Sequence, residues 1–333
     1  MKKLSTTKLS VLDLAPIVEG HSIADSFHNT LDLARHVERL GYERFWMAEH
    51  HNLEGIASAA TAVLIGYVAG GTSKIRVGSG GIMLPNHAPL VIAEQFGTLE
   101  TLYPGRIDLG LGRAPGTDPM TMRALRRDMT DKNVEFSDQV QELQYYFAQP
   151  QPGQRIKAVP GAGINVPIWL LGSSLYSAQL AAVMGLPYAF AGHFAPELMM
   201  RAIDIYRVGF QPSEVLKEPR VMVGVQVIGA DTDEQAHFLA TTNYQRFLGI
   251  IRNQRMHLKP PVKDMEGIWS PQEKELVQQK MKTSVFGSPA TVKAGLEKLI
   301  AETEADELMI VSDTYEHSDR LKSFEIIMDA TRN

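Results

Sequence analysis

Short apolar segments of β type alternate with amphipathic helical segments along the whole chain. Eight such segments end in small and polar residues: Lys8–Ala15, Arg44–Ala48, Lys74–Ile82, Arg106–Gly112, Pro167–Gly172, Pro187–His193, Arg220–Ile228 and Glu307–Ser312. Strict alternation of this kind predicts a parallel sheet, because parallel strands need helical crossovers. Eight units in one chain predict an α/β fold of the closed (β/α)8 type, whose chemistry lies at the carboxyl ends of the strands.

One segment departs from this rhythm after the seventh strand. Asp231–Arg252 predicts an extra helix, the residues around Met256–Lys282 contain three prolines, and a barrel helix resumes only at Ser288–Ala301. Insertions of this length in a compact domain are usually functional lids or disordered segments. We therefore expect a single domain over residues 1–333, with an insertion at 253–285 that is either a mobile lid or a surface excursion.

Composition narrows the classes of partner. The chain carries 33 Lys and Arg against 38 Asp and Glu, a formal net charge of −5, and no cysteine. This balance gives no support to a nucleic-acid or membrane surface. The absence of cysteine excludes disulfides and thiol catalysis and suits a cytoplasmic protein. The apolar start is interrupted by Lys8, Ser10 and Asp13, so we interpret it as the first strand and not as a signal peptide.

The second strand ends in three consecutive titratable residues, Glu49, His50 and His51. Neighbouring strand residues point to opposite faces, so both histidines reach one metal ion only if the chain turns sharply. Histidine titrates near neutrality, which favours a proton-transfer or ligand-orienting role. The alternative is that Glu49 and one histidine only tie down the loop.

Glycines mark the end of the third strand. Gly80 and Gly81 lie where a barrel strand faces the site, and glycine within a strand often marks close approach by a ligand or by backbone. Two explanations are equally consistent with this pattern. Either a flat ligand lies against the bare backbone, or the packing of the barrel requires glycine.

The fourth and fifth strands end in residues suited to an anion. Arg113 follows Gly110-Leu111-Gly112, which is only a weak dinucleotide fingerprint, because Pro115 replaces its last glycine. Guanidinium groups bind phosphates well. Gly172, Ser173 and Ser174 lead through Ser177 into a helix, whose first amides form an anion site unless a serine merely caps them. His193, at the end of the sixth strand, would face the same mouth, although a lone histidine more often has a structural role.

Together these strand ends resemble the bacterial luciferase-like superfamily of flavin-dependent monooxygenases. The resemblance runs over nearly the whole chain and rests on segments in register: Phe45–His51, Val77–Pro85, Tyr103–Arg106, Gly110–Arg113, Pro167–Ser174 and Ser284–Pro289. The chain is most similar to a branch whose members mostly have unknown substrates.

The resemblance implies a (β/α)8 barrel with an insertion, a homodimer, and FMN bound at the carboxyl ends of the strands. Gly80-Gly81 matches a non-prolyl cis peptide beside the flavin ring. Arg113, Ser173, Ser174 and Ser177 match residues that hold the FMN phosphate. The other expected FMN-binding positions are Gly80, Gly81, Met83, Gly172 and His193. His50 matches the catalytic histidine, with Glu49 and His51 beside it, and the insertion matches a mobile loop that shields the flavin.

The chain also departs from the light-emitting members. Gly112 stands where they carry a cysteine, Ser173 where they carry a glutamate, and His193-Phe194 where they carry a tryptophan-containing segment. We therefore expect neither light emission nor a long-chain aldehyde substrate. Ser173 can still bind the phosphate through its backbone amide.

These observations lead to four hypotheses. The leading one is an oxidoreductase that acts on paired donors and incorporates molecular oxygen. Reduced FMN from a separate flavin reductase would react with O2 to a C4a-peroxyflavin that oxidises a small organic substrate, and His50 would transfer the proton. The alternatives are hydride transfer with the deazaflavin F420, a non-catalytic FMN-binding protein, and a metal-dependent hydrolase that uses Glu49, His50 and His51.

Overall fold

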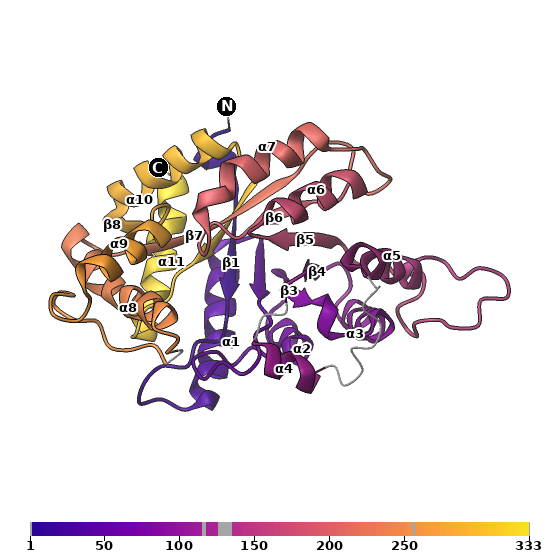
Figure 1. The fold of residues 1–333 in the computed structure, drawn as a ribbon, viewed down its shortest axis with the longest axis horizontal. Coiled ribbons are helices and arrows are strands. Elements are labelled where there is room, and N and C mark those ends of the chain that lie inside the picture. Colours follow the sequence, from indigo (N-terminus) through magenta and orange to yellow (C-terminus); the bar gives the residue numbers. More distant parts are fainter. Residues whose placement is uncertain (1, 115–117, 126–134, 255–256, 333) are drawn as a thin grey trace.

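Eight parallel strands form one closed barrel. The computed structural model describes residues 2–114, 118–125, 135–254 and 257–332. The barrel strands are β1 (Lys8–Asp13), β2 (Arg44–Met47), β3 (Arg76–Met83), β4 (Ile107–Gly112), β5 (Ile168–Gly172), β6 (Tyr188–Phe190), β7 (Val221–Gly229) and β9 (Glu307–Val311). They pair in the order β6-β5-β4-β3-β2-β1-β9-β7, and β6 also pairs with β7, which closes the ring (Figure 1). The predicted (β/α)8 barrel is therefore confirmed.

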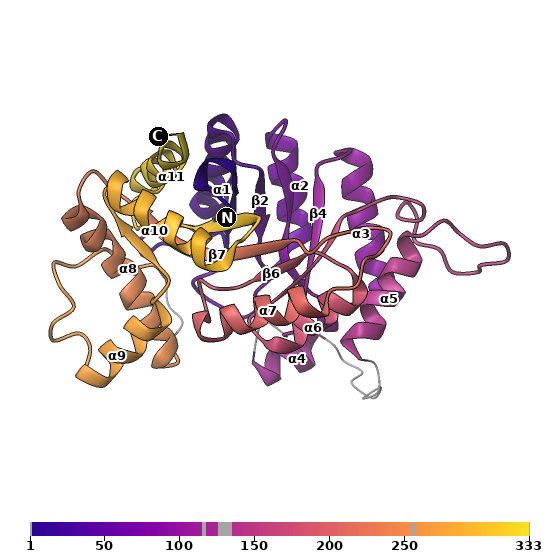
Figure 2. The same ribbon diagram turned by 90° about the horizontal axis from the view of Figure 1, so that it is seen from above.

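Helices surround the strands on all sides (Figure 2). The α-helices outside the insertion are α1 (Ile23–Leu40), α2 (Thr61–Gly71), α3 (Pro89–Leu102), α4 (Pro119–Leu125), α5 (Phe136–Phe147), α6 (Leu175–Met184), α7 (Met199–Gly209), α10 (Pro289–Thr303) and α11 (His317–Arg332). The described residues also form the short 3-10 helices η1 (Leu4–Thr6), η2 (Leu84–Asn86) and η3 (Pro196–Leu198). No helix among the described residues is both long and apolar enough to cross a membrane.

Capping residues set the two ends of the first helix, α1. Ser22 accepts a hydrogen bond from the Asp25 amide, and the Asp25 carboxylate accepts one from the Ser22 amide, which makes a reciprocal capping box. Gly41 ends the helix at φ 94°, a left-handed conformation in which glycine avoids the steric penalty of a side chain. Local residues thus set both ends of α1.

The barrel interior is packed below the carboxyl ends of the strands. Its buried apolar residues include Leu12, Trp46, Trp169, Met222 and Met309. The rings of Trp46 and Trp169 meet edge to face, with 5.5 Å between their centroids. This layer is the floor on which a site at the carboxyl ends can rest.

Charged side chains close the amino end of the barrel. The Arg44 guanidinium contacts Asp108 Oδ2 at 2.6 Å through Nη1 and Glu307 Oε1 at 2.6 Å through Nε. Arg76 adds a second contact to Asp108 at 2.6 Å, and Arg220 adds one to Glu307 at 3.2 Å. Asp108 and Glu307 are fully buried, so these bonds compensate charge that would otherwise be costly to desolvate.

The insertion after β7 builds a small unit beside the barrel. It contains α8 (Asp233–Ile251), α9 (Pro271–Lys280) and β8 (Val285–Gly287), and β8 pairs with the end of β7. Figure 1 shows this unit at the opposite end of the molecule from the long loop after α5. The unit has its own apolar cluster: Ile228, Ala230, Ala236, Leu239, Ala240, Phe247, Leu248, Met265, Val277, Met281 and Phe286.

The extra helix that the sequence predicts is thus present as α8, and the insertion follows the seventh strand as expected. The three-residue strand β8 was not predicted, because so short a segment carries no readable alternation. The sixth strand is shorter than predicted and ends at Phe190, so His193 lies in the turn that follows it. Motion of residues 253–285 as a lid stays a prediction.

Candidate functional site

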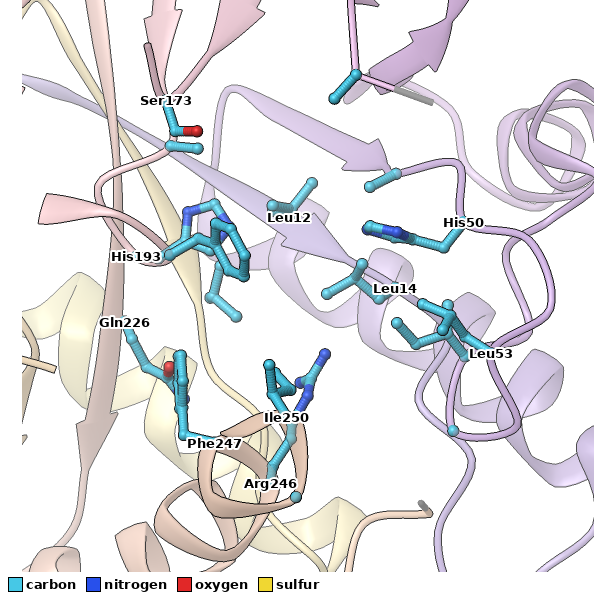
Figure 3. Close-up of a pocket in the computed structure, with 18 of the residues that line it drawn as sticks. Leu12, Leu14, His50, Leu53, Ser173, His193, Gln226, Arg246, Phe247 and Ile250 are labelled. Carbon is cyan, nitrogen blue, oxygen red and sulfur yellow. The ribbon is translucent and has the colours of Figure 1, made fainter. Parts of the chain in front are cut away.

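A pocket of about 680 Å³ opens at the carboxyl ends of the strands. Leu12, Leu14 and Val311 line its apolar floor. Helix α8 contributes one wall through Arg246, Phe247, Ile250 and neighbouring residues (Figure 3). This position agrees with the general rule that (β/α)8 barrels carry their sites at this end.

Part of the insertion lies over the entrance. The Leu258 amide donates to the Ile17 carbonyl at 2.8 Å, and the Glu19 amide donates to the Leu258 carbonyl at 2.8 Å. The Thr242 hydroxyl of α8 donates to the Lys259 carbonyl at 3.0 Å. These bonds connect the loop after β1, the segment around Leu258 and helix α8 along one side of the pocket.

The structure brings together most of the residues that the sequence singled out. The pocket is lined by His50 and by all nine positions expected to bind FMN: Gly80, Gly81, Met83, Arg113, Gly172, Ser173, Ser174, Ser177 and His193. Figure 3 shows His50 and His193 projecting from different walls, with Leu12 and Leu14 between them. Glu49 and His51 are not among the lining residues.

Glu49 instead organises the wall behind His50. Its carboxylate is 1% exposed and lies 2.7 Å from His51 Nε2 and 2.8 Å from His87 Nε2, and it accepts a hydrogen bond from the Met83 amide at 2.9 Å. Burial alone would raise the pKa of Glu49, but the hydrogen bonds from His87, His51 and Met83 outweigh it and hold this pKa below its ordinary value. The carboxylate therefore stays ionised at neutral pH and ties the ends of β2 and β3 together.

The side chains of His50 and His51 take different directions, since His50 lines the pocket and His51 contacts Glu49. The ligand atoms of Glu49, His51 and His87 lie within 4.8 Å of one another, a spacing compatible with a metal ion. His50 does not belong to this group, so the set differs from the Glu49, His50 and His51 cluster considered from the sequence. His87 was missed, because its distance of 38 positions from Glu49 gives no local signal.

Packing explains the glycines of β3. A Cβ on Gly80 would approach Leu12 Cδ1 to 2.8 Å, and one on Gly81 would approach the Gly110 carbonyl oxygen to 2.6 Å. The peptide bond between Gly80 and Gly81 is cis, and the register between β3 and β4 shifts at this point. Barrel packing thus demands both glycines, and both also present backbone to the pocket.

Helix α6 points its amino end at the pocket. Ser174 stands at the N-cap position, but its side chain makes no capping hydrogen bond, and Ser177 Oγ donates to the Ser174 carbonyl at 3.0 Å. The interpretation of ordinary serine capping is therefore wrong here. A Cβ on Gly172 would lie 2.2 Å from Ser177 Oγ, so glycine is needed for the strand to meet the helix. The first amides of α6 remain available to an anion.

Arg113 stands next to this helix start. Its guanidinium lies 4.2 Å from the centroid of the Tyr176 ring, a cation–π distance. Tyr176 thus places Arg113 near the start of α6, and Arg113 shares the pocket lining with Ser173 and Ser174. The arginine, the two serines and the helix start form one positively polarised corner.

His193 is held neutral. Its Nδ1 atom is buried without a hydrogen-bond partner among the described residues, and a Cβ on Gly224 would lie 2.4 Å from it. Burial and, to a smaller extent, the positive charge of Arg246 lower the pKa of His193 to about 4, against the opposing effect of the Asp313 carboxylate. At neutral pH the ring is an uncharged imidazole that faces the pocket.

This shift predicts a loss of stability in mild acid. The unfolded chain protonates His193 near its ordinary pKa of 6.5 and the folded chain only near 4, so the unfolded state binds more protons between these values. The free energy of unfolding should therefore fall as pH decreases through this window, and it should fall less in His193→Gln. Urea denaturation at a series of pH values measures this, with exposed His28→Gln as the control. Parallel pH profiles for the wild type and His193→Gln would contradict the assignment.

The sequence missed the residues that α8 contributes. Arg246, Phe247 and Ile250 of α8 line the pocket, as does Gln226 of β7, but nothing in the pattern of α8 distinguishes its inward residues from an ordinary buried helix face. Only the way the insertion folds back over the barrel selects them.

The fold is thus a closed (β/α)8 barrel with one pocket at the carboxyl ends of its strands. A family model described as luciferase-like monooxygenase matches residues 7–307, and the chain therefore belongs to the luciferase-like monooxygenase family. It is 59% identical to the uncharacterized protein YvbT of Bacillus subtilis (strain 168), over 98% of this chain and 97% of that protein. It is 53% identical to a luciferase-like monooxygenase of Escherichia coli (strain K12), over 97% of each.

Solved structures agree with this fold. The crystal structure of apo-MsnO8 has a TM-score of 0.87 at 35% identity, over 98% of both chains. The oxygenating constituent of 3,6-diketocamphane monooxygenase from Pseudomonas putida, in complex with FMN, has a TM-score of 0.74 at 19% identity, over 97% of both chains. An F420-dependent secondary alcohol dehydrogenase has a TM-score of 0.66 at 14% identity, over 98% of this chain and all of that one. The last two likenesses concern the fold alone.

Proposed function

We propose that the protein is a flavin-dependent monooxygenase that uses reduced FMN and O2 on a small organic substrate. Reduced FMN would come from a separate flavin reductase, since no dinucleotide-binding half is evident in the chain. The observation that carries the proposal is one pocket that combines an anion corner at Arg113 and α6 with bare backbone at Gly80 and Gly81. The family, which includes proteins named as monooxygenases, supports it.

The residues that line the pocket are of the types that FMN needs. The amides at the start of α6, together with Arg113, Ser173 and Ser174, would hold the phosphate. The backbone of Gly80 and Gly81 would lie beside the ring. Bound reduced FMN supplies the activation of O2, and the protein supplies position and exclusion of water.

Two histidines have distinct tasks in this proposal. His50 would hold and move the proton at the reacting position, because it lines the pocket and its neighbour Glu49 keeps the surrounding wall fixed. His193 would stay uncharged and offer a neutral ring on another wall, since its pKa is about 4. The apolar residues Leu12, Leu14 and Ile250 would exclude water from the space between them.

Anaerobic titration with FMN, reduced FMN and reduced F420, followed by stopped-flow mixing with O2, tests the proposal. We expect tight binding of reduced FMN and a reaction with O2 that is altered by the protein. Preference for reduced F420 and turnover without oxygen consumption would show a hydride-transfer enzyme instead. If FMN binds but neither a substrate nor a replacement of His50 changes its behaviour, the protein stores or carries FMN.

We also propose that the protein is a homodimer. Helix α2 is apolar on nearly all sides, yet it exposes Val63 by 72% and Tyr67 by 41%, and nearby α3 exposes Val91 by 43% and Leu102 by 62%. Exposed apolar side chains on adjacent helices are typical of a surface that a partner covers. Light scattering after size-exclusion chromatography should give twice the chain mass of 36.8 kDa. A monomer mass at micromolar concentration would contradict this.

A further inference from the structure

The pocket is positively charged although the protein is acidic. Of the described residues that line it, none is Asp or Glu, whereas four are basic: Arg113, Arg246, Arg252 and Lys259. The whole chain has a net charge of −5. Concentration of one sign of charge in a cleft with low-dielectric walls raises the local concentration of the opposite sign. The pocket therefore selects anionic ligands, and one phosphate accounts for only one of its cations.

The two remaining arginines, Arg246 and Arg252, differ in their hydrogen-bond partners. The Arg252 guanidinium is engaged twice with Glu273, at 2.7 and 2.9 Å, and donates to the Ile268 carbonyl at 2.9 Å. Arg246 donates from Nη1 to Asp313 Oδ2 at 2.5 Å, which is its one hydrogen bond within the described residues. A guanidinium carries five N–H donors, so most of the donors of Arg246 remain for a ligand.

Arg246 is fixed in place from behind. Asp313 also accepts a hydrogen bond from Arg320 at 3.0 Å, and its backbone carbonyl accepts one from Asn243 at 2.8 Å. Asp13 contacts the same Arg320 at 3.1 Å. This arrangement holds Arg246 in one direction while its guanidinium stays partly exposed to the pocket, with 23% of the side chain accessible. A fork held in advance loses little conformational entropy when it binds an anion.

Arg246 is separate from the proposed phosphate corner. Figure 3 shows Ser173 and Arg246 on opposite sides of His193, with Ile250 beside Arg246 and Phe247 farther along the same wall. Its charge reaches the pocket interior, because it contributes to the low pKa of His193. The space between Arg246 and His50 is floored by Leu14 and Leu12.

We propose that the substrate carries a carboxylate, which Arg246 binds, and an apolar part that lies over Leu12 and Leu14 toward His50. A carboxylate matches the guanidinium fork through two parallel hydrogen bonds. That this ligand is a substrate rests on the proposed monooxygenase function. The binding of a carboxylate at Arg246 is testable without turnover.

Matched probes test the inference. Isothermal titration calorimetry with 4-phenylbutyrate and with its neutral isostere 4-phenylbutyramide is carried out on the protein loaded with oxidised FMN. The wild type should bind the carboxylate roughly 10- to 100-fold more tightly than the amide, the range expected of hydrogen bonds to a charged group. Arg246→Met should abolish this preference and leave the affinity for FMN unchanged. Arg252→Met, which removes a pocket cation already bound to Glu273, should reduce the preference less than threefold.

Two further measurements keep the outcomes distinct. If Arg246→Met fails to fold, as judged by circular dichroism and melting, Arg246→Lys replaces it: the charge beside Asp313 remains, the fork is lost, and the preference should fall at least threefold. If FMN does not bind, the proposed function fails, while the preference for carboxylate in the protein alone still decides this inference. Equal affinity for the two probes, no measurable binding of either, or an unchanged preference in the Arg246 variants overturns it.

Discussion

Replacing His50 by alanine should slow substrate turnover by roughly 10²- to 10⁴-fold, the range expected when a general acid or base is removed. His50 lines the pocket in which we propose that FMN binds, whereas its neighbours Glu49 and His51 do not. The affinity for FMN should change little, because the phosphate corner at Arg113 is untouched. Single-turnover product formation measures the effect, with a substrate found by screening oxygen consumption and guided by the carboxylate preference.

His257→Ala is the matched control for this experiment. His257 also lines the pocket, but it belongs to the insertion and not to a barrel strand. We expect its removal to cost less than threefold in turnover. A loss below threefold in His50→Ala, or equal losses in the two variants, would remove the proton-transfer role from His50.

Replacing Arg44 by methionine should lower the free energy of unfolding by about 3–5 kcal/mol, because one partner of a buried ion network is lost. Arg44 bridges Asp108 and Glu307 at 2.6 Å each, and both carboxylates are fully buried. Arg76 and Arg220 each keep one contact to this pair, but neither joins the two carboxylates. Urea denaturation measures the change.

An exposed ion pair provides the comparison. Lys298 and Glu302 lie one turn apart on α10 with 3.9 Å between their charged atoms, and both side chains are more than half exposed. Lys298→Met should change the free energy of unfolding by less than about 0.5 kcal/mol. If Arg44→Met were no more destabilising than Lys298→Met, the amino-end network would not contribute measurably to stability.

The sequence predicted the barrel well because its signals are local. Apolar runs, helix caps such as Ser22 and Gly41, and the small residues after each strand are all readable over a few positions. A closed barrel then forces the strand ends together, which is why His50, Arg113 and Ser173 were predicted to share one site from three distant segments. The same rule would hold for any chain with this alternation.

The rest of the site depends on tertiary contacts that leave no local pattern. Glu49 turns behind the wall because His87 and the Met83 amide meet it there. Arg246 faces the pocket because Asp313, far along the chain, holds it. In both cases the partner lies on another segment, and the direction of a side chain follows from the partner. Periodicity predicts which residues are buried and does not predict which polar group a buried residue meets.

The separate apolar cluster of the insertion has an evolutionary consequence. Val277, Met281 and Phe286 pack with buried residues of α8 in an apolar cluster that is separate from the main barrel core. Substitutions on the inward face of α8 can therefore diversify ligand preference while the strand ends that would hold the cofactor remain unchanged. Recombination of the segment from α8 to β8 between relatives should transfer selectivity as a unit.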